Sequence, residues 1–249
     1  MSPAPEPPGT QFTLGFPHEP TTSREDFVVG PANAEAIALI EAMPEWPPRG
    51  LLLIGPEGSG KSHLVSIWST FPGAAVIAAR DLARDDADRL TAGGAAAVED
   101  LHQGPLDEAA LFHLLNLANE RDAKVLLTTR LPVASLHLAL PDLVSRLRAM
   151  RLVTLGAPDD DLLRRVLMKL FADRQVEIEP GVLSYVATRM ERSFAAANRI
   201  VAPLDKAALA EGRGVTRRLA AQILGGIADA AQGDLWDERA ESPPSGADR

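Results

Sequence analysis

Two hydrophobic patterns follow one another along the chain, and the change between them falls near residue 157. Before it, short apolar runs alternate with segments in which apolar residues recur at helical spacing. Strands that are apolar at nearly every position and alternate with helices are typical of a parallel sheet covered on both faces. The fold class predicted for this part is therefore α/β. The apolar runs predict strands at 51–54, 74–79, 95–98, 124–129 and 150–155, and the helical spacing predicts helices at 33–43, 63–70, 80–90 and 107–121.

After residue 157 only helical patterns occur. Apolar residues recur every three or four positions from Leu162 to Phe171, which predicts an amphipathic helix. Similar patterns predict three more helices and no strand, so that the four helices cover 159–175, 180–191, 194–209 and 216–227. The polar, proline-containing ends of the chain are expected to lack stable structure. The expected organisation is a flexible arm at 1–21, an α/β domain at 22–156, a small helical domain at 157–228 and a disordered tail at 229–249.

The composition is that of an acidic protein of 249 residues with a net charge of −9 and no cysteine. The lack of cysteine excludes disulfides, cysteine-ligated zinc and thiol catalysis. No run of about 18 apolar residues occurs, so no membrane span is predicted. Since the N-terminus also lacks the pattern of a signal peptide, we expect a cytoplasmic protein. The negative charge argues against a general electrostatic attraction to DNA, although a local basic face remains open.

The first predicted strand runs directly into a glycine-rich loop. The segment Gly55-Pro-Glu-Gly-Ser-Gly-Lys-Ser62 fits the pattern G-x-x-x-x-G-K-[ST] at every fixed position. In such a loop the backbone N–H groups converge on a phosphate, and the next helix begins with the positive end of its dipole at the anion. We expect Lys61 to reach the β- and γ-phosphates and the Ser62 hydroxyl to ligate Mg²⁺. A chance match in a Gly/Ser-rich loop is the alternative, but the strand before the loop and the helix after it favour a phosphate site.

Two carboxylates, Glu99 and Asp100, follow the third predicted strand. A nucleoside triphosphate site needs acidic groups at the end of a second buried strand, to hold Mg²⁺ through water and to orient an attacking water. We predict that Glu99 contacts the metal through water and that Asp100 takes part in catalysis. An ordinary polar strand end is the alternative. The nucleotide-binding residues predicted in and beside the loop are Gly55, Gly58, Ser59, Gly60, Lys61, Ser62 and His63.

Two groups of arginines are further candidates for contact with phosphates. Arg146, Arg148 and Arg151 cluster just before and at the start of the fifth predicted strand. Arginine offers a planar fork of donors that stabilises charge on a transferring phosphoryl group, often on a neighbouring subunit. In the helical domain, Arg192 and Arg199 lie two helical turns apart and could reach the phosphates across the domain cleft. For both groups a solvated surface position is the alternative, and their spacing does not choose between the two.

Several segments together resemble the DnaA branch of AAA+ proteins, and the resemblance covers roughly residues 11–227. The segment from Leu140 to Leu147 is particularly similar to that of Hda-type regulators, which belong to this branch. No helix-turn-helix domain, such as DnaA carries after its lid, is expected in the chain. The segments that carry the resemblance are Asp26-Phe-Val-Val-Gly30, Gly60-Lys-Ser-His-Leu64, Leu140-Pro-Asp-Leu-Val-Ser-Arg-Leu147 and the helical domain, which is similar to an AAA+ lid.

The resemblance implies a P-loop NTPase core that binds ADP or ATP with Mg²⁺ beneath a helical lid. It implies that Val29 contacts the adenine and that Arg192 is the sensor-2 arginine, which touches the nucleotide. Arg146 would be an arginine finger that acts in trans on ATP held by the DnaA initiator. The implied function is negative regulation of chromosomal replication initiation, because hydrolysis converts DnaA to its inactive ADP form.

An apolar hexad lies in the proline-rich arm. From its composition alone, Gln11-Phe-Thr-Leu-Gly-Phe16 can be either a short strand that packs on the domain or a segment that docks into a partner. Hda-type proteins carry a motif of the form Gln-x-x-Leu-x-Phe at this place, and it binds the β sliding clamp of DNA polymerase III. By this resemblance Gln11, Leu14 and Phe16 are the clamp-binding residues, and contact with DNA is expected to be indirect, through the clamp.

Two positions depart from the family pattern. The acidic motif begins with Glu99 where the family usually has Asp, and Arg130 follows Thr129 where DnaA proteins tend to have an acid. Both departures predict weak ATP turnover by the protein's own site. A stand-alone DNA-remodelling ATPase of the helicase-loader type and a clamp adaptor with a structural nucleotide are the alternative functions. The sequence leaves open whether the protein forms a homo-oligomer.

Overall fold

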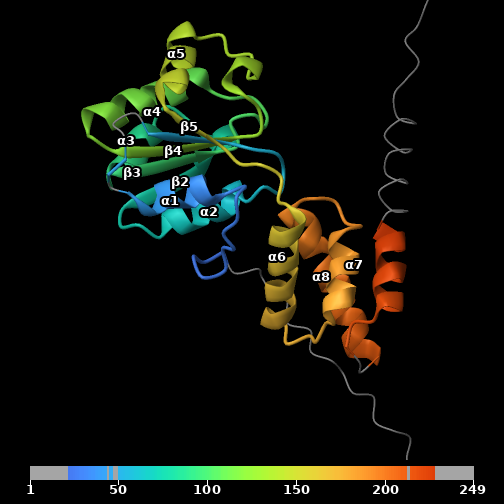
Figure 1. The fold of residues 1–249 in the computed structure, drawn as a ribbon. Coiled ribbons are helices and arrows are strands. Elements are labelled where there is room, and N and C mark those ends of the chain that lie inside the picture. The colour runs from blue at the N-terminus through green and yellow to red at the C-terminus, as the bar shows by residue number, and fades with distance from the viewer. Residues whose placement is uncertain (1–21, 44, 47–49, 212–213, 228–249) are drawn as a thin grey trace, which may run out of the picture.

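The computed structural model of the chain describes residues 22–43, 45–46, 50–211 and 214–227. In these residues Figure 1 shows an α/β part and a helical part that lie side by side. The predicted clamp-binding residues Gln11, Leu14 and Phe16 lie outside the described residues.

Five parallel strands form one sheet in the order β2-β3-β4-β1-β5. Successive side chains of a strand point to opposite faces. Leu52 therefore joins the core on one face, whereas Leu51 and Leu53 join the core on the other. All five predicted strands are confirmed, as is the α/β class with a parallel sheet. The strands are β1 (Leu51–Ile54), β2 (Ala74–Ala78), β3 (Ala95–Glu99), β4 (Lys124–Thr129) and β5 (Arg151–Thr154).

Helices cover both faces of the sheet (Figure 1). Ile40 and Trp68 fill the core between the sheet and the first two helices, and Leu111, Leu114 and Leu143 fill the core on the opposite face. The first face carries α1 (Ala34–Glu41) and α2 (Lys61–Ser69), and the second carries α3 (Asp86–Thr91), α4 (Glu108–Glu120) and α5 (Pro141–Ala149). Two short 3₁₀ turns, η1 (Ala79–Asp81) and η2 (Val133–Ser135), follow β2 and β4.

The helix predicted at 80–90 is wrong as a single element. The chain forms η1 first and begins α3 only at Asp86. The Asp86 carboxylate accepts a hydrogen bond from the Ala83 amide at 3.0 Å, and such local side-chain bonds compete with a continuous helix. The charged residues of this segment therefore form a turn and the start of a shorter helix.

The sequence pattern also missed α5. Within this helix only Leu143 and Leu147 are buried, and they lie four residues apart among polar and charged positions. So narrow a stripe gives a weak periodic signal. Pro141 at the first helical position was the better indication, since proline is favoured there.

The helical part has a hydrophobic core of its own. Phe171, Val186 and Leu204 are buried at its centre. All four predicted helices are present, and an isolated bridge between Ile178 and Val215 is the one β contact among the described residues of this part. None of the helices described in either part is long and apolar enough to cross a membrane. The helices are α6 (Asp160–Asp173), α7 (Pro180–Ala187), α8 (Phe194–Glu211) and a last one over 217–227.

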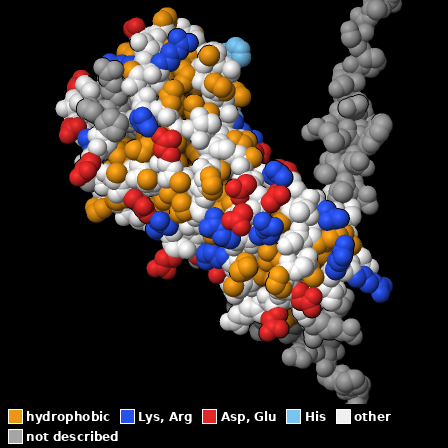
Figure 2. Space-filling view, viewed as in Figure 1, with side chains coloured by type: hydrophobic (Ala, Val, Ile, Leu, Met, Phe, Trp, Pro, Cys, Tyr) orange, Lys and Arg blue, Asp and Glu red, His pale blue; other side chains and the backbone are white. Residues whose placement is uncertain are grey.

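The two parts meet through close contacts near the phosphate loop. The Phe194 amide, at the start of α8, donates to the Gly58 carbonyl at 2.8 Å. Gly30 packs so tightly against Leu162 of α6 that an added Cβ would lie 2.8 Å from a Leu162 methyl. Figure 2 shows acidic and basic side chains interleaved where the two parts adjoin. The position of the helical part is therefore tied directly to the loop that follows β1.

Candidate nucleotide-binding site

The glycine-rich loop between β1 and α2 has the backbone that a phosphate cradle needs. Gly58 and Gly60 have φ values of 67° and 97°, which favour glycine because other residues are strained there. Gly60 caps α2, so the free N–H groups of the first helical turn and the positive end of the helix dipole lie directly after the loop. Ser59 adds a buried hydroxyl that has no hydrogen-bond partner among the described residues. These features fit an anion with several acceptor oxygens.

Lys61 lies across this loop. Its Nζ donates to the carbonyl oxygens of Gly55 and Pro56, at 2.7 and 2.8 Å. Burial lowers the pKa of the ammonium group, while the nearby Asp100 carboxylate opposes that shift. A buried ammonium with short carbonyl bonds costs solvation free energy, which an anionic ligand would offset. Lys61 thus lies at the loop where phosphates are predicted to bind.

Ser62, Glu99 and Asp100 lie together at the carboxyl ends of the strands. The Ser62 hydroxyl donates to the Glu99 carboxylate, but burial is the larger influence and raises the pKa of Glu99. Asp100 has a φ of 59° and its amide donates to Thr128 Oγ1 at 2.9 Å. All three border one small cavity of about 140 Å³. The groups fit a Mg²⁺ ion that Ser62 would ligate directly and Glu99 through water, with bound phosphates as further ligands.

A larger cavity of about 390 Å³ opens between the loop and the helical part. Its size suits a small organic ligand. The loop and α2 supply one wall, the segment from Thr22 to Asn33 another, and α6 and α8 the third. The residues that line it outside the loop include Phe27, Val28, Asn33, Asp100, Arg130, Val166, Lys169, Leu170, Arg174, Phe194 and Asn198.

Val28, rather than Val29, lines this cavity. The Asn33 side chain fixes the turn: its Oδ1 accepts from the Gly30 amide at 2.8 Å and its Nδ2 donates to the Val28 carbonyl at 3.1 Å. Val29 is exposed, and its carbonyl accepts a 2.8 Å hydrogen bond from Arg165 of α6. Val29, the predicted adenine contact, is thus not among the residues that line this cavity, whereas its neighbour Val28 is.

His63 forms part of the wall, as its prediction as a nucleotide-binding residue requires. Its Nε2 lies 2.8 Å from the Ser23 carbonyl oxygen, and its ring meets the edge of Phe27 at 5.1 Å between centroids. Burial lowers the pKa of His63, which favours the neutral imidazole. The side chain thereby joins α2 to the segment that leads into the cavity.

Arg192 lies outside the wall of the cavity. It forms an ion pair of 2.9 Å with Asp160, at the start of α6, and its side chain is 62% exposed. Three consecutive aspartates, at 159–161, make that helix end attractive to a cation. In this arrangement Arg192 joins two segments of the helical part, and the cavity's cations are Lys61, Arg130, Lys169 and Arg174.

Arg130 extends across the mouth of the cavity to the phosphate loop. Its Nη1 lies 2.7 Å from the Glu57 carboxylate, and its amide donates to His102 Nδ1 at 3.2 Å. The sequence drew attention to Arg130 only as a departure from the family pattern. The structure makes it a charged neighbour of Lys61 and Asp100, so it belongs to the site.

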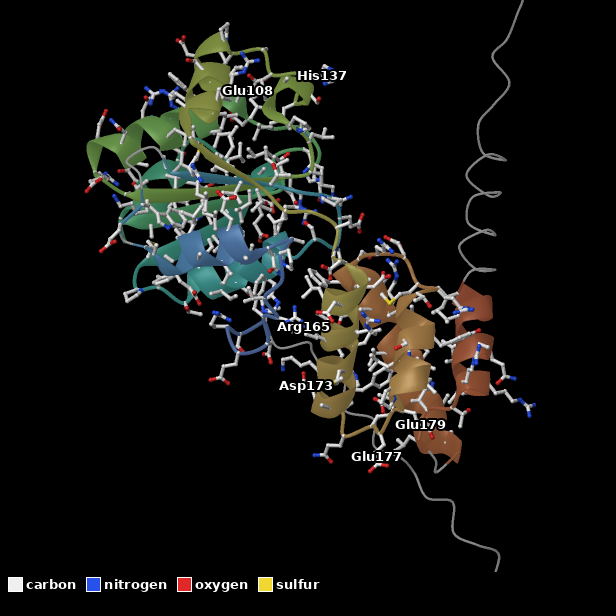
Figure 3. All side chains as sticks on the ribbon, in the orientation of Figure 1. Glu108, His137, Arg165, Asp173, Glu177 and Glu179 are labelled. Carbon is white, nitrogen blue, oxygen red and sulfur yellow. The ribbon has the colours of Figure 1, made fainter. Side chains whose placement is uncertain are left out.

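Lys169 connects α6 to the segment before the cavity. Its Nζ contacts the carboxylates of Asp26 at 2.6 Å and Asp173 at 3.0 Å. The hydrogen bond that Lys169 donates to the Asp26 carboxylate is the main cause of the raised pKa of Lys169. Figure 3 shows Arg165 and Asp173 on the side of α6 that faces the α/β part. Together with the Arg165 bond to Val29, this contact holds the helical part over the cavity.

Replacing Lys169 by alanine is expected to lower the free energy of unfolding by about 0.5–1 kcal/mol, the range for partly exposed ion pairs. Urea denaturation with and without nucleotide measures this free energy of unfolding. We also expect a few-fold loss of nucleotide affinity, because the helical part is held less firmly. The matched control is Lys206→Ala, at an exposed α8 residue with no ion pair or hydrogen bond in the described chain. Equal effects of both substitutions would contradict this role.

The three clustered arginines differ in their surroundings. Arg146 is exposed on α5 and its guanidinium lies 5.0 Å from the centroid of the Phe112 ring. Arg151, at the start of β5, forms a 2.6 Å ion pair with Glu35 of α1. Arg148 is exposed and has no such partner among the residues that the structure describes. Arg146 borders a second cavity of about 480 Å³, between α4 and α5, and not the one beside the phosphate loop.

Known proteins share this fold, although no protein-family model matches the chain. Over 203 residues, or 70% of this chain, the sequence is 23% identical to the chromosomal replication initiator protein DnaA of Cutibacterium acnes. Domain III of the Thermotoga maritima replication initiation protein DnaA matches 85% of this chain and 98% of that chain, with a TM-score of 0.71 and 19% identity. The chain has a DnaA-type AAA+ fold.

Other AAA+ structures agree with this assignment. AMPPCP-bound DnaA from Aquifex aeolicus matches 74% of this chain and 65% of that chain, with a TM-score of 0.62 and 18% identity. The Thermotoga maritima RuvB Holliday junction branch migration motor matches 82% of this chain and 72% of that chain, with a TM-score of 0.65 and 16% identity. The sequence match covers 40% of the length of the curated initiator, so the similarity concerns part of that protein. The sequence match and the shared fold together support a relationship between this chain and DnaA.

The sequence predicted the contiguous phosphate-loop part of the candidate site and missed most of the residues that form the cavity walls. Asn33 carried a usable signal, since asparagine before an apolar-periodic segment marks a helix start. Lys169, Arg174 and Asn198 carried none, because they lie on amphipathic helices where a charged or polar residue is normally solvated. Only the packing of the helical part against the loop brings them to the cavity.

Proposed function

We propose that this AAA+ protein acts as an Hda-type regulator: it binds an adenine nucleotide and promotes hydrolysis of ATP held by DnaA. The observation that carries the proposal is the position of Arg146. It is exposed on the face of the sheet opposite α2, and it does not line the protein's own nucleotide cavity. An arginine so placed is available to another molecule's phosphates, which is what an arginine finger in trans requires.

The protein's own nucleotide would occupy the cavity between the phosphate loop and the helical part, with its phosphates at Lys61 and its base near Phe27 and Val28. An adenine nucleotide is proposed because the DnaA of Aquifex aeolicus has been solved with AMPPCP. Mg²⁺ would be held by Ser62 and, through water, by Glu99. A nucleotide there would contact both parts of the molecule and would fix the helical part against the sheet.

We propose weak turnover at this site. Burial raises the pKa of Glu99, and its carboxylate accepts the Ser62 hydroxyl that would ligate the metal. Arg130 is engaged by Glu57 at the mouth of the cavity. An efficient ATPase needs preorganised charge at the transferring phosphoryl group. The arrangement is better suited to holding a nucleotide than to hydrolysing it.

The arm is proposed to bind the β sliding clamp through Gln11, Leu14 and Phe16. Replacing Leu14 and Phe16 together by alanine is expected to weaken clamp binding by at least about tenfold, since buried apolar anchors dominate such interfaces. Surface plasmon resonance with immobilised clamp measures this, and Thr13→Ala is the control within the same segment. Clamp binding by the double variant at wild-type affinity would refute the proposed motif.

A clamp adaptor with a structural nucleotide is the second candidate. It is favoured by the bonds that join the helical part to the loop, such as that from Phe194 to Gly58. In that case the nucleotide would stabilise the fold, and the protein would tether partners without changing DnaA–ATP.

The experiment that separates the candidates measures hydrolysis of DnaA-bound ATP with clamp loaded on DNA. The regulator is expected to accelerate hydrolysis only when clamp and DNA are both present, because contact with DNA is proposed to be indirect. Clamp binding without any acceleration would favour the adaptor. Rapid ATP turnover by the protein with DNA alone would contradict both.

A further inference from the structure

One face of α4 holds α5, the helix that carries Arg146, at two points. Glu108 and Phe112 lie four residues apart on α4, and therefore on the same face of that helix. We infer that Glu108 and Phe112 are positioning residues that set the place and direction of Arg146. The inference rests on the proposed function, because it concerns the arginine that is assigned to DnaA-bound ATP.

Glu108 fixes where α5 begins. Its two carboxylate oxygens accept hydrogen bonds from the backbone amides of Ala139, at 2.9 Å, and Leu140, at 2.8 Å. Leu140 occupies the N-cap position but has no side-chain acceptor for the free amides of the helix start. Figure 3 shows Glu108 beside α5. A carboxylate at a helix N-terminus is favoured by the helix dipole as well as by these bonds, so Glu108 replaces the missing cap.

The face of the Phe112 ring contacts the guanidinium of Arg146. The Arg146 Cζ lies 5.0 Å from the ring centroid, which is within the range of a cation–π contact. In the described chain, the N–H groups of Arg146 donate no hydrogen bond and form no ion pair. The stacked guanidinium therefore keeps its direction while its donors stay available. Those are the two properties that contact with a partner's phosphate requires.

The neighbouring arginines lack this combination. Arg148 is on the same helix, two residues later, and within the described part of the chain it has no ion pair, hydrogen bond or ring contact that would set its direction. Arg151 has a fixed direction, but that direction is set by its ion pair with Glu35, to which its Nη2 donates. Phe112 also borders, with Arg146, the cavity between α4 and α5, so the guanidinium is not enclosed by packing. Among the three arginines, α4 thus singles out Arg146.

The experiment uses the full-length protein with DnaA–ATP and clamp loaded on DNA. It measures the maximum hydrolysis rate and the concentration of regulator that gives half of it. Phe112→Leu keeps the apolar volume and removes the ring face, whereas Phe112→Tyr keeps the face. Glu108→Gln keeps one acceptor and removes the charge and the second acceptor.

Phe112→Leu and Glu108→Gln are each expected to lower the maximum rate by about threefold to tenfold, with the half-maximal concentration unchanged, because only the orientation of Arg146 is affected. Phe112→Tyr should restore the rate. In the background of Arg146→Ala, Phe112→Leu should cause no further loss. A merely structural role of Phe112 would instead lower the melting temperature, with Tyr and Leu acting alike.

The outcomes separate this inference from the proposed function. If Arg146→Ala stimulates hydrolysis as well as the wild type, the proposed function fails. If Arg146→Ala is inactive while Phe112→Leu and Glu108→Gln keep the full rate, only the positioning role is overturned. If Phe112→Leu does not fold, Phe112→Tyr and Glu108→Gln decide. A full maximum rate for Glu108→Gln overturns the positioning role, and so does a maximum rate of Phe112→Tyr that is lowered threefold or more.

Discussion

Arg146→Ala is expected to reduce stimulated hydrolysis of DnaA-bound ATP by about 10³-fold, or to the basal rate of DnaA if that is reached first, as for other arginine fingers in trans. The loss should lie in the maximum rate, because the guanidinium acts on the charge that develops in the transition state. The fold should be unaffected. Arg146 is exposed and its one described contact is the Phe112 ring. Single-turnover hydrolysis of labelled ATP on DnaA, with clamp on DNA, measures the effect.

Two variants of the same region control this result. Arg148→Ala removes an exposed cation of the same helix that has no described partner, and the rate should stay within about twofold of the wild type. Arg146→Lys keeps the positive charge but loses the planar fork, so it should restore little of the activity. Binding of ADP to the regulator itself should not change in any of them. If Arg148→Ala is the inactive variant, the finger has been assigned to the wrong residue.

The sheet could be predicted because its strands are short, apolar and buried. In β3, for example, Ala95 to Val98 are all buried, so the continuous apolar run is itself the signal of a central parallel strand. The α5 helix escaped detection for the opposite reason, since two buried leucines among charged residues give little periodicity. The helix predicted at 80–90 was divided by a hydrogen bond that the Ala83 amide donates to the Asp86 side chain, which helix propensities do not describe.

The candidate site could be predicted where its residues are contiguous in the sequence. Lys61 and Ser62 follow from one motif, and Glu99 follows from the end of the next buried strand. By contrast, the choice between Val28 and Val29 depends on how Asn33 folds the turn. The acidic start of α6 turns Arg192 toward Asp160, a choice that spacing along the chain does not reveal. The cavity residues of the helical part could therefore not be predicted from the sequence, because tertiary contacts decide which of them reach the site.

A site that holds a nucleotide between two parts of a molecule couples binding to stability. Lys61 is central to that coupling because it is buried next to the loop carbonyls that it contacts. Burial lowers its pKa, so the unfolded chain binds this proton more tightly than the folded protein does. At neutral pH the charged amine therefore opposes folding. The penalty disappears as the pH rises above 10.5, the ordinary value for lysine.

Lys61→Met is therefore expected to separate binding from folding. Without nucleotide, the variant should unfold at the same temperature as the wild type or higher, because a desolvated charge is replaced by an apolar side chain of similar length. Its affinity for ADP or ATP should fall by about 10²-fold or more, since the charge that faces the phosphates is gone. Calorimetric titration measures the affinity, and thermal melts with and without nucleotide measure the coupling.

The melts should show the contrast most clearly. Excess nucleotide is expected to raise the melting temperature of the wild type, because a ligand that binds only the folded state stabilises it, and to raise that of Lys61→Met much less. Lys206→Met, on the exposed side of α8, should respond as the wild type does. If nucleotide raises the melting temperature of Lys61→Met as much as that of the wild type, the phosphates do not bind at Lys61. The cavity between the loop and the helical part would then need another occupant.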